Sequence, residues 1–156
     1  MIISNSQFIE TVQQEKAKGE IVVATDGCFD ILHIGHLRYL QEAQKLGTLL
    51  VVSVLGDTSV RRLKGSGRPI ICEDQRAEML LGLKSVAYVT IVRDARPTSL
   101  ICELRAHFYV KGGDYTLETL PGREVLEKNC GEIVFLPITP SVSTTNIVRR
   151  IRETDV

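Results

Sequence analysis

The stretch IVVATDGCFDILHIGH, residues 21–36, decides the fold of this 156-residue chain. It opens with a short apolar, β-branched run at 21–25, passes through a turn that contains Gly27, and runs into a helical pattern at 35–46. A strand that leads directly into a helix is the first half of a strand–helix–strand unit, whose two strands lie parallel in one sheet. The stretch therefore predicts the start of a parallel α/β sheet.

The same alternation continues along the rest of the chain. Four further short apolar runs are typical of strands buried on both faces, at 49–54, 86–92, 108–111 and 133–136. Helical periodicity is found at 6–18, 35–46, 73–83, 98–105, 122–128 and 144–153. We predict a single α/β domain over residues 1–156, Rossmann-like and doubly wound, with a five-stranded parallel sheet in the order 3-2-1-4-5 and helices on both faces.

Glycines mark three of the predicted helix ends. Gly19, Gly47 and Gly131 each fall just past a helical run. A helix commonly ends in a residue with left-handed backbone, which glycine adopts without strain. We therefore expect all three to be left-handed.

The composition narrows the possible partners. Hydrophobic residues make up 44% of the chain, which suffices for a core, and 19 basic residues balance 19 acidic ones. A balanced charge gives no general attraction for nucleic acid or an anionic membrane, so neither is an expected partner.

The four cysteines form no C-x-x-C pair, which argues against a zinc or redox site. With no leader or membrane span in the sequence, we expect a cytoplasmic protein with reduced thiols.

In a doubly wound sheet, ligands bind outside the carboxyl ends of strands 1 and 4, where the winding direction changes. His33 and His36 follow strand 1 and are three residues apart at a helix start, so both can face this crevice. The backbone N–H groups of a helix start favour an anion, and Gly35 permits its close approach. This spacing predicts a phosphate site.

Other interpretations of this segment remain open. A single histidine is more often a surface or hydrogen-bonded core residue than a ligand. The histidine pair could also bind a metal, with Asp30 as a further ligand, although Asp30 could equally cap the turn. Cys28 could be a nucleophile, although a small buried residue fits its surroundings better.

Three further polar segments follow strands 2, 4 and 5. Glycines and cations at 61–69, with Lys64 and Arg68, predict a mobile loop that folds over a triphosphate; the alternative is a solvated basic loop. Lys111 can place its charge on a phosphate, and Asp114 suits a hydroxyl or ring amine of a nucleotide, unless the segment is an ordinary glycine turn. The hydroxyl run at 143–145 can hold a phosphate, or Ser143 can serve as a plain helix cap.

These segments together resemble the H-x-G-H nucleotidyltransferase superfamily. The similarity runs from about residue 20 to 152 and is greatest to the adenylyltransferase half of the bifunctional heptose 7-phosphate kinase/heptose 1-phosphate adenylyltransferases. The matching strings lie at 27–36, 38–40, 59–65, 68–69, 76–78, 110–115 and 143–147. One departure is Pro140-Ser141-Val142, which stands where that branch has a glycine-containing turn.

The resemblance implies an activity and a set of site residues. It implies transfer of AMP from ATP to a phosphorylated sugar, with Mg²⁺ entering with ATP, a homodimer, and a separate sugar kinase that supplies the acceptor. A cytidylyltransferase for an alcohol phosphate such as glycerol 3-phosphate, and a non-catalytic nucleotide-binding module, are the alternatives. The implied catalytic residues are His33, His36 and Lys111. The implied nucleotide-binding residues are Gly27, Cys28, Phe29, Asp30, Gly35, Lys64, Arg68, Asp114, Ser143, Thr144 and Thr145.

Overall fold

The computed structural model describes residues 2–93, 97–113 and 115–154. One parallel sheet has the order β3-β2-β1-β4-β5, which confirms the predicted α/β fold and strand order. The register sets Thr25 of β1 opposite Val52 of β2 and Val110 of β4, so the ends of β1 and β4 lie side by side. The strands are β1 (Val22–Gly27), β2 (Leu49–Leu55), β3 (Tyr88–Val92), β4 (Phe108–Gly112) and β5 (Glu132–Leu136).

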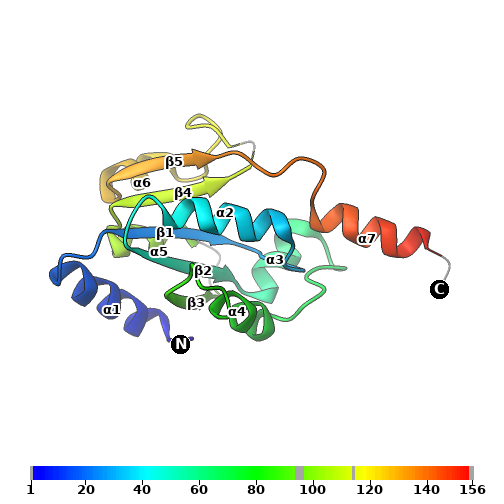
Figure 1. Cartoon of the computed structure of the whole chain (residues 1–156), viewed down its shortest axis with the longest axis horizontal. Helices are drawn as coiled ribbons and strands as arrows, with labels where there is room; N and C mark the ends of the chain where they lie inside the picture. Colours follow the sequence, from blue (N-terminus) through cyan, green and yellow to red (C-terminus); the bar gives the residue numbers. More distant parts are fainter. Residues whose placement is uncertain (1, 94–96, 114, 155–156) are drawn as a thin grey trace.

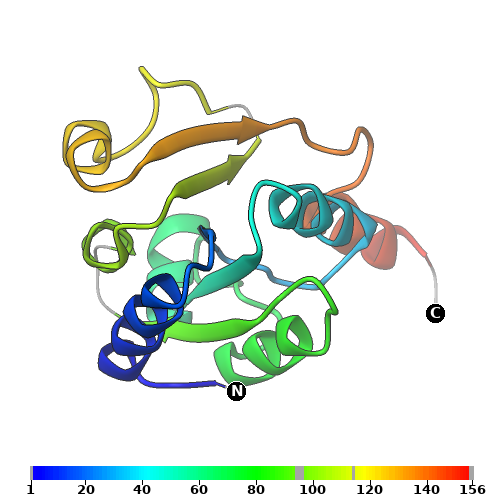
Figure 2. The ribbon, with the colours of Figure 1, turned by 60° about the vertical axis from the view of Figure 1, so that its left-hand side comes forward.

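Helices pack on both faces of the sheet, as predicted (Figures 1 and 2). Side chains of α1, α5 and α6 share one buried cluster with the sheet, and side chains of α2 and α4 share another on the opposite face. The last helix, α7, lies beyond the carboxyl ends of the strands (Figure 1). The helices are α1 (Asn5–Ala17), α2 (Ile34–Gln44), α3 (Asp57–Lys64), α4 (Glu73–Leu81), α5 (Pro97–Leu104), α6 (Arg123–Asn129) and α7 (Thr144–Glu153).

Helix α3 is an element that the sequence interpretation missed. The basic segment at 61–69 was predicted to be a loop, but its first four residues form the last turn of α3, which ends where Gly65 takes a φ of 93°. Only Ser59 and Val60 of this helix are buried. A helix with so narrow a buried face shows little apolar periodicity, although Arg, Leu and Lys all favour helix.

The three helix-end glycines serve two different purposes. Gly19 has a φ of 95°, as predicted, but Gly47 and Gly131 are absent from the positive-φ residues of the described chain. Those two predictions were wrong, because close backbone packing requires the glycines. A Cβ on Gly47 would lie 2.4 Å from the Ile21 carbonyl oxygen, and one on Gly131 would lie 2.3 Å from the His107 carbonyl oxygen.

Two further observations concern the membrane spans and the cysteines considered in the sequence analysis. Within residues 2–93, 97–113 and 115–154, none of the helices has the length and apolar character that crossing a bilayer requires. All four cysteines are free thiols, with Cys102 and Cys130 buried, Cys28 half-buried and Cys72 exposed.

The close packing at Gly47 leads to a stability prediction. The Ile21 carbonyl accepts hydrogen bonds from the Thr48 and Leu49 amides, so it cannot move away from an added methyl group. We expect Gly47→Ala to lower the free energy of unfolding by about 2 kcal/mol or more. The measurement is urea unfolding of the purified variant.

Gly67→Ala is the matched control, because no atom lies within 4 Å of its added Cβ and Gly67 is not among the positive-φ residues. Its stability should change by less than about 1 kcal/mol. Equal stabilities of the two variants would contradict the packing explanation.

Candidate functional site

A cavity of about 560 Å³ opens at the carboxyl ends of β1 and β4, where the sequence predicted a ligand. Of the predicted site residues, Arg68 does not line it, and Asp114 lies outside the described residues. The structure brings the others together from four separate segments: Gly27, Cys28, Phe29, Asp30, Gly35, His33, His36, Lys64, Lys111, Ser143, Thr144 and Thr145.

The histidine pair is organised by the start of α2. His33 is the N-cap, and its Nδ1 accepts hydrogen bonds from the backbone N–H groups of Gly35 (3.1 Å) and His36 (3.4 Å). The two imidazole rings stack with centroids 3.8 Å apart. Because Nδ1 of His33 is an acceptor, the proton of the neutral ring sits on Nε2, which can donate to a ligand. These two backbone amides, which were expected to face an anion directly, thus donate to the imidazole of His33.

Gly35 is needed for this arrangement. A Cβ at this position would lie 2.9 Å from Cε1 and 3.0 Å from Nδ1 of the His33 ring. A larger residue would therefore displace the capping imidazole. This is a second reason for glycine here, besides the close approach of a phosphate that the sequence suggested.

Both histidines are held in the neutral form. Burial, followed by the nearby His33 and Lys64, lowers the pKa of His36 from 6.5 to about 4, although Asp30 opposes the shift. Burial also lowers the pKa of His33. At neutral pH the pair therefore offers hydrogen bonds rather than positive charge.

Asp30 holds the site together. Its side chain is 2% exposed, and its carboxylate accepts hydrogen bonds from Arg68 Nη1 (2.7 Å) and from the Ile70 and Ile71 amides (3.0 Å each). Its backbone oxygen accepts a bond from Thr144 Oγ1 (2.6 Å). Asp30 thus joins the turn after β1 to the segment before α4 and to the start of α7.

Arg68 is consequently placed differently from the prediction. It was expected to face a triphosphate together with Lys64, but its guanidinium is directed to Asp30, and its side chain is only 14% exposed. A buried carboxylate requires a cation and hydrogen bonds to offset its loss of hydration, and Arg68 supplies the cation. Lys64 does line the cavity, at the end of α3.

Two partners of the site escaped the sequence interpretation. Arg76 is 1% exposed and donates hydrogen bonds to the Cys28 carbonyl, to the Ile71 carbonyl (2.9 Å) and to Asp57 (2.7 Å). Asp26 binds the Lys111 ammonium through Oδ2 (2.9 Å). Arg76 lies in the matching string at 76–78, but the sequence assigned it no role, because a buried arginine is not expected from a helical pattern. An acidic residue directly before Gly27, at the end of an apolar strand, was a signal that could have been used.

The hydroxyl run at the start of α7 has a mixed role. Ser143 is the N-cap and accepts a hydrogen bond from the Asn146 amide (3.1 Å), as in the plain-cap interpretation, while also lining the cavity. Ahead of it, Ser141 has a φ of 62° in the segment where the resembling branch has a glycine-containing turn. Ser141 thus takes a left-handed conformation without being glycine, at the cost of some backbone strain.

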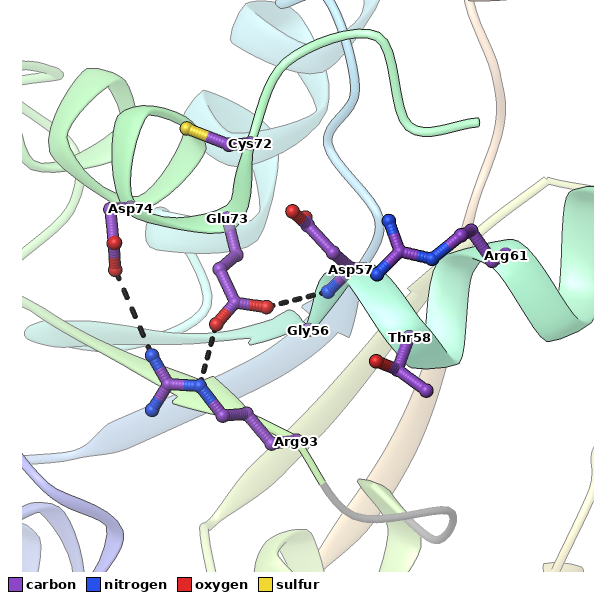
Figure 3. A pocket seen from close by; sticks show the side chains of 8 residues that line it. All are labelled: Gly56, Asp57, Thr58, Arg61, Cys72, Glu73, Asp74 and Arg93. Carbon is purple, nitrogen blue, oxygen red and sulfur yellow. Dashed lines mark hydrogen bonds and ion pairs between the residues drawn. The ribbon is translucent and has the colours of Figure 1, made fainter. Parts of the chain in front are cut away.

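A second, smaller cavity of about 320 Å³ is lined by residues of α3, of the start of α4 and by Arg93 (Figure 3). Glu73 accepts a hydrogen bond from the Asp57 amide (2.6 Å) and pairs with Arg93 (2.5 Å), which also lies 3.8 Å from Asp74. The carboxylates of Glu73 and Asp74 are therefore directed to the same arginine, as the dashed lines in Figure 3 show.

The described residues contain no group of three or more His, Cys, Asp or Glu side chains that could hold a metal ion. In the larger cavity, the carboxylate of Asp26 is directed to Lys111, and that of Asp30 to Arg68. The metal-site interpretation of the histidine pair gains no support from this arrangement.

The low pKa of His36 predicts a loss of stability in acid. Between about pH 6.5 and 4, His36 takes up a proton on unfolding but not in the folded protein, so the free energy of unfolding falls as the pH falls through this window. A His36→Gln variant cannot titrate and should lose less stability over the same interval. Urea unfolding of both proteins at the two ends of this window measures the difference. Equal losses in the two proteins would show that His36 does not carry the effect.

Sequence and structure comparisons place the chain among known proteins. Residues 24–150 match the Cytidylyltransferase-like family. The "Bifunctional protein HldE" of Pelobacter propionicus is 46% identical over 142 residues, which cover 91% of this chain and 29% of that protein. The protein of the same name from Trichlorobacter lovleyi is 44% identical over 152 residues, covering 97% of this chain and 31% of that protein. The chain thus spans less than a third of the length of these relatives.

A solved structure agrees with this relationship. The lipopolysaccharide core biosynthesis protein from Thermoplasma volcanium GSS1 has a TM-score of 0.64 and 28% sequence identity, and the match covers 78% of this chain and 98% of that one. The family match spans most of the chain and includes the whole histidine segment. The superfamily resemblance is therefore confirmed, and this chain belongs to the Cytidylyltransferase-like family.

Proposed function

We propose that this chain is an adenylyltransferase that transfers AMP from ATP to D-glycero-β-D-manno-heptose 1-phosphate and releases pyrophosphate. The observation that carries the proposal is the stacked, neutral histidine pair at the start of α2, inside a cavity that Lys64 and Lys111 also line. The choice of ATP and heptose is supported by the resemblance to the heptose adenylyltransferase branch and by the relatives named "Bifunctional protein HldE".

The proposed reaction is an in-line displacement. A phosphate oxygen of the sugar 1-phosphate attacks the α-phosphorus of ATP, the bond from that phosphorus to the oxygen bridging to the β-phosphate breaks, and pyrophosphate leaves with the bonding electrons. A phosphate monoester is largely ionised at neutral pH, so no strong general base is needed. Catalysis then consists of positioning and charge stabilisation.

The cavity residues have distinct proposed roles in this step. The His33 Nε2–H donates to an oxygen of the reacting phosphate. His36, whose ring stacks against that of His33, is proposed to donate a second hydrogen bond to the same phosphate. Lys64, at the end of α3, and Lys111, in β4, contribute positive charge from two separate segments of the lining. Such preorganised donors act where charge accumulates in the transition state.

Mg²⁺ is proposed to enter with the nucleotide, held by phosphate oxygens and water. The donor set of the described cavity residues does not suit a protein-held ion, because Asp26 and Asp30 each already face a cation. No step of the reaction is assigned to the ion.

Two further parts of the proposal rest on the resemblance: a homodimer, and supply of the sugar 1-phosphate by a separate sugar kinase. A cytoplasmic location is also proposed, on the sequence pattern described above.

The substrate assignment is tested by a matrix of donors and acceptors. Pyrophosphate release is measured with ATP, CTP, GTP and UTP, each against heptose 1-phosphate, other sugar 1-phosphates and glycerol 3-phosphate. We expect the fastest release from ATP with heptose 1-phosphate. Faster release from CTP with glycerol 3-phosphate would overturn the heptose assignment but keep the nucleotidyl transfer. ATP binding with no release from any pair would favour a non-catalytic module.

The histidine pair provides the test of mechanism. We expect His33→Ala and His36→Ala each to lower turnover by about a hundredfold to a thousandfold, while ATP binding by calorimetry weakens far less, because the donors act mainly in the transition state. Thermal unfolding of each variant serves as the folding control. Turnover within about threefold of the wild type in both variants would show that the pair has a structural role only.

A further inference from the structure

Asp26 lies where the sheet meets the cavity, and both of its carboxylate oxygens are engaged. Oδ2 lies 2.9 Å from the Lys111 ammonium, while Oδ1 accepts a hydrogen bond from the Tyr109 hydroxyl. The side chain of Asp26 is 5% exposed and that of Lys111 is 15% exposed, yet both line the cavity. The carboxylate is therefore fixed from the protein side by Tyr109 and directed toward the lysine.

Tyr109 is suited to hold this carboxylate. Its ring is buried, and burial, together with the neighbouring Asp26, strongly raises the pKa of its hydroxyl. The hydroxyl consequently remains a proton donor at any working pH. A neutral donor that cannot ionise keeps the carboxylate of Asp26 in one orientation.

The Lys111 ammonium is confined on several sides. It lies 3.5 Å from the backbone oxygen of Asp26, 5.8 Å from the centroid of the Tyr109 ring and 5.6 Å from that of the Tyr115 ring. An ammonium within about 6 Å of a ring centroid is attracted to the ring face. Because an ammonium has three N–H donors, the two contacts with Asp26 leave one donor for a ligand in the cavity.

We propose that Asp26 is a positioning residue, which acts through Lys111 to fix one N–H donor toward the reacting phosphates and to reduce the net charge that those phosphates meet. The inference rests on the proposed function, since it assigns Lys111 to a nucleotide phosphate. A lysine on a flexible stem loses little freedom on binding when it is already held. The carboxylate also repels phosphate, so the same contact prevents overly tight binding of the nucleotide and of pyrophosphate.

The first experiment tests the holding of Lys111 in the free protein and requires no nucleotide. Acetylation of lysines by limiting acetic anhydride is followed at Lys111 by mass spectrometry in the wild type and in Asp26→Asn. The variant should be labelled about fivefold faster, because its ammonium has lost its ionised partner. Lys45, which pairs with Glu42 on the surface, is the internal reference. Equal rates at Lys111 would overturn the proposal whatever the activity of the protein.

The second experiment separates binding from turnover by a double-mutant cycle. Asp26→Asn keeps the size of the side chain but removes its charge. We expect the lost repulsion of phosphate to outweigh the lost preorganisation of Lys111 in binding, so that the Kd of ATP with Mg²⁺ falls by about threefold or more. Turnover should fall by about tenfold, because Lys111 is no longer aligned with the reacting phosphates. In a Lys111→Met background, the same substitution should leave turnover unchanged within about twofold. An effect of equal size in both backgrounds would show that Asp26 does not act through Lys111.

Two controls complete the test. Glu42→Gln removes one exposed carboxylate that does not line the cavity, and it should leave Kd and turnover as in the wild type. That result would show that the effect of Asp26→Asn does not come from the total charge of the protein. Thermal unfolding of each variant identifies a purely structural effect, which would lower the stability of the protein without lowering the Kd of ATP. If Lys111 is labelled faster in Asp26→Asn but the wild-type protein binds no nucleotide, the proposed function is refuted. The holding of Lys111 by Asp26 is supported in that case all the same.

Discussion

The buried carboxylate of Asp30 is the constraint on which the site depends. A carboxylate removed from water is tolerated only when a cation and hydrogen bonds compensate it, and breaking such a pair typically costs about 3–5 kcal/mol. Its partners are Arg68 and two amides about forty residues further along the chain. Arg76 ties the same two segments together through the carbonyls of Cys28 and Ile71. The turn after β1 therefore has one geometry, and the position of His33 follows from it.

The cavity proposed to bind phosphate carries little net charge. Its histidines are neutral, Lys111 is balanced by Asp26, and the charges of the whole chain also balance. Fixed N–H donors in a partly buried crevice interact with phosphate oxygens more strongly than mobile surface charges do. A site of this kind distinguishes ligands by the positions of their oxygen atoms, whereas a strongly basic surface would attract any polyanion.

The parts of the protein that could be predicted from sequence are those encoded locally. The five strands, their order and the pairing of His33 with His36 at a helix start follow from periodicity and spacing. The placement of Arg68 did not, because it depends on a partner 38 residues away, whose burial the sequence does not reveal. The same holds for Arg76. Helix α3 was missed because its buried face is so narrow. The role of Gly47 was missed because it depends on a contact with the Ile21 carbonyl, 26 residues earlier in the chain.

The last helix has a consequence for the dynamics of the cavity. None of the ten residues of α7, all of them described, is buried, and its start is attached to the turn after β1 through Thr144 and Asp30. Elements with few buried contacts open by local unfolding at a small fraction of the global free energy. Amide hydrogens of α7 should therefore exchange with solvent while the sheet stays closed. One wall of the crevice is thus set by a segment whose order a bound ligand can increase.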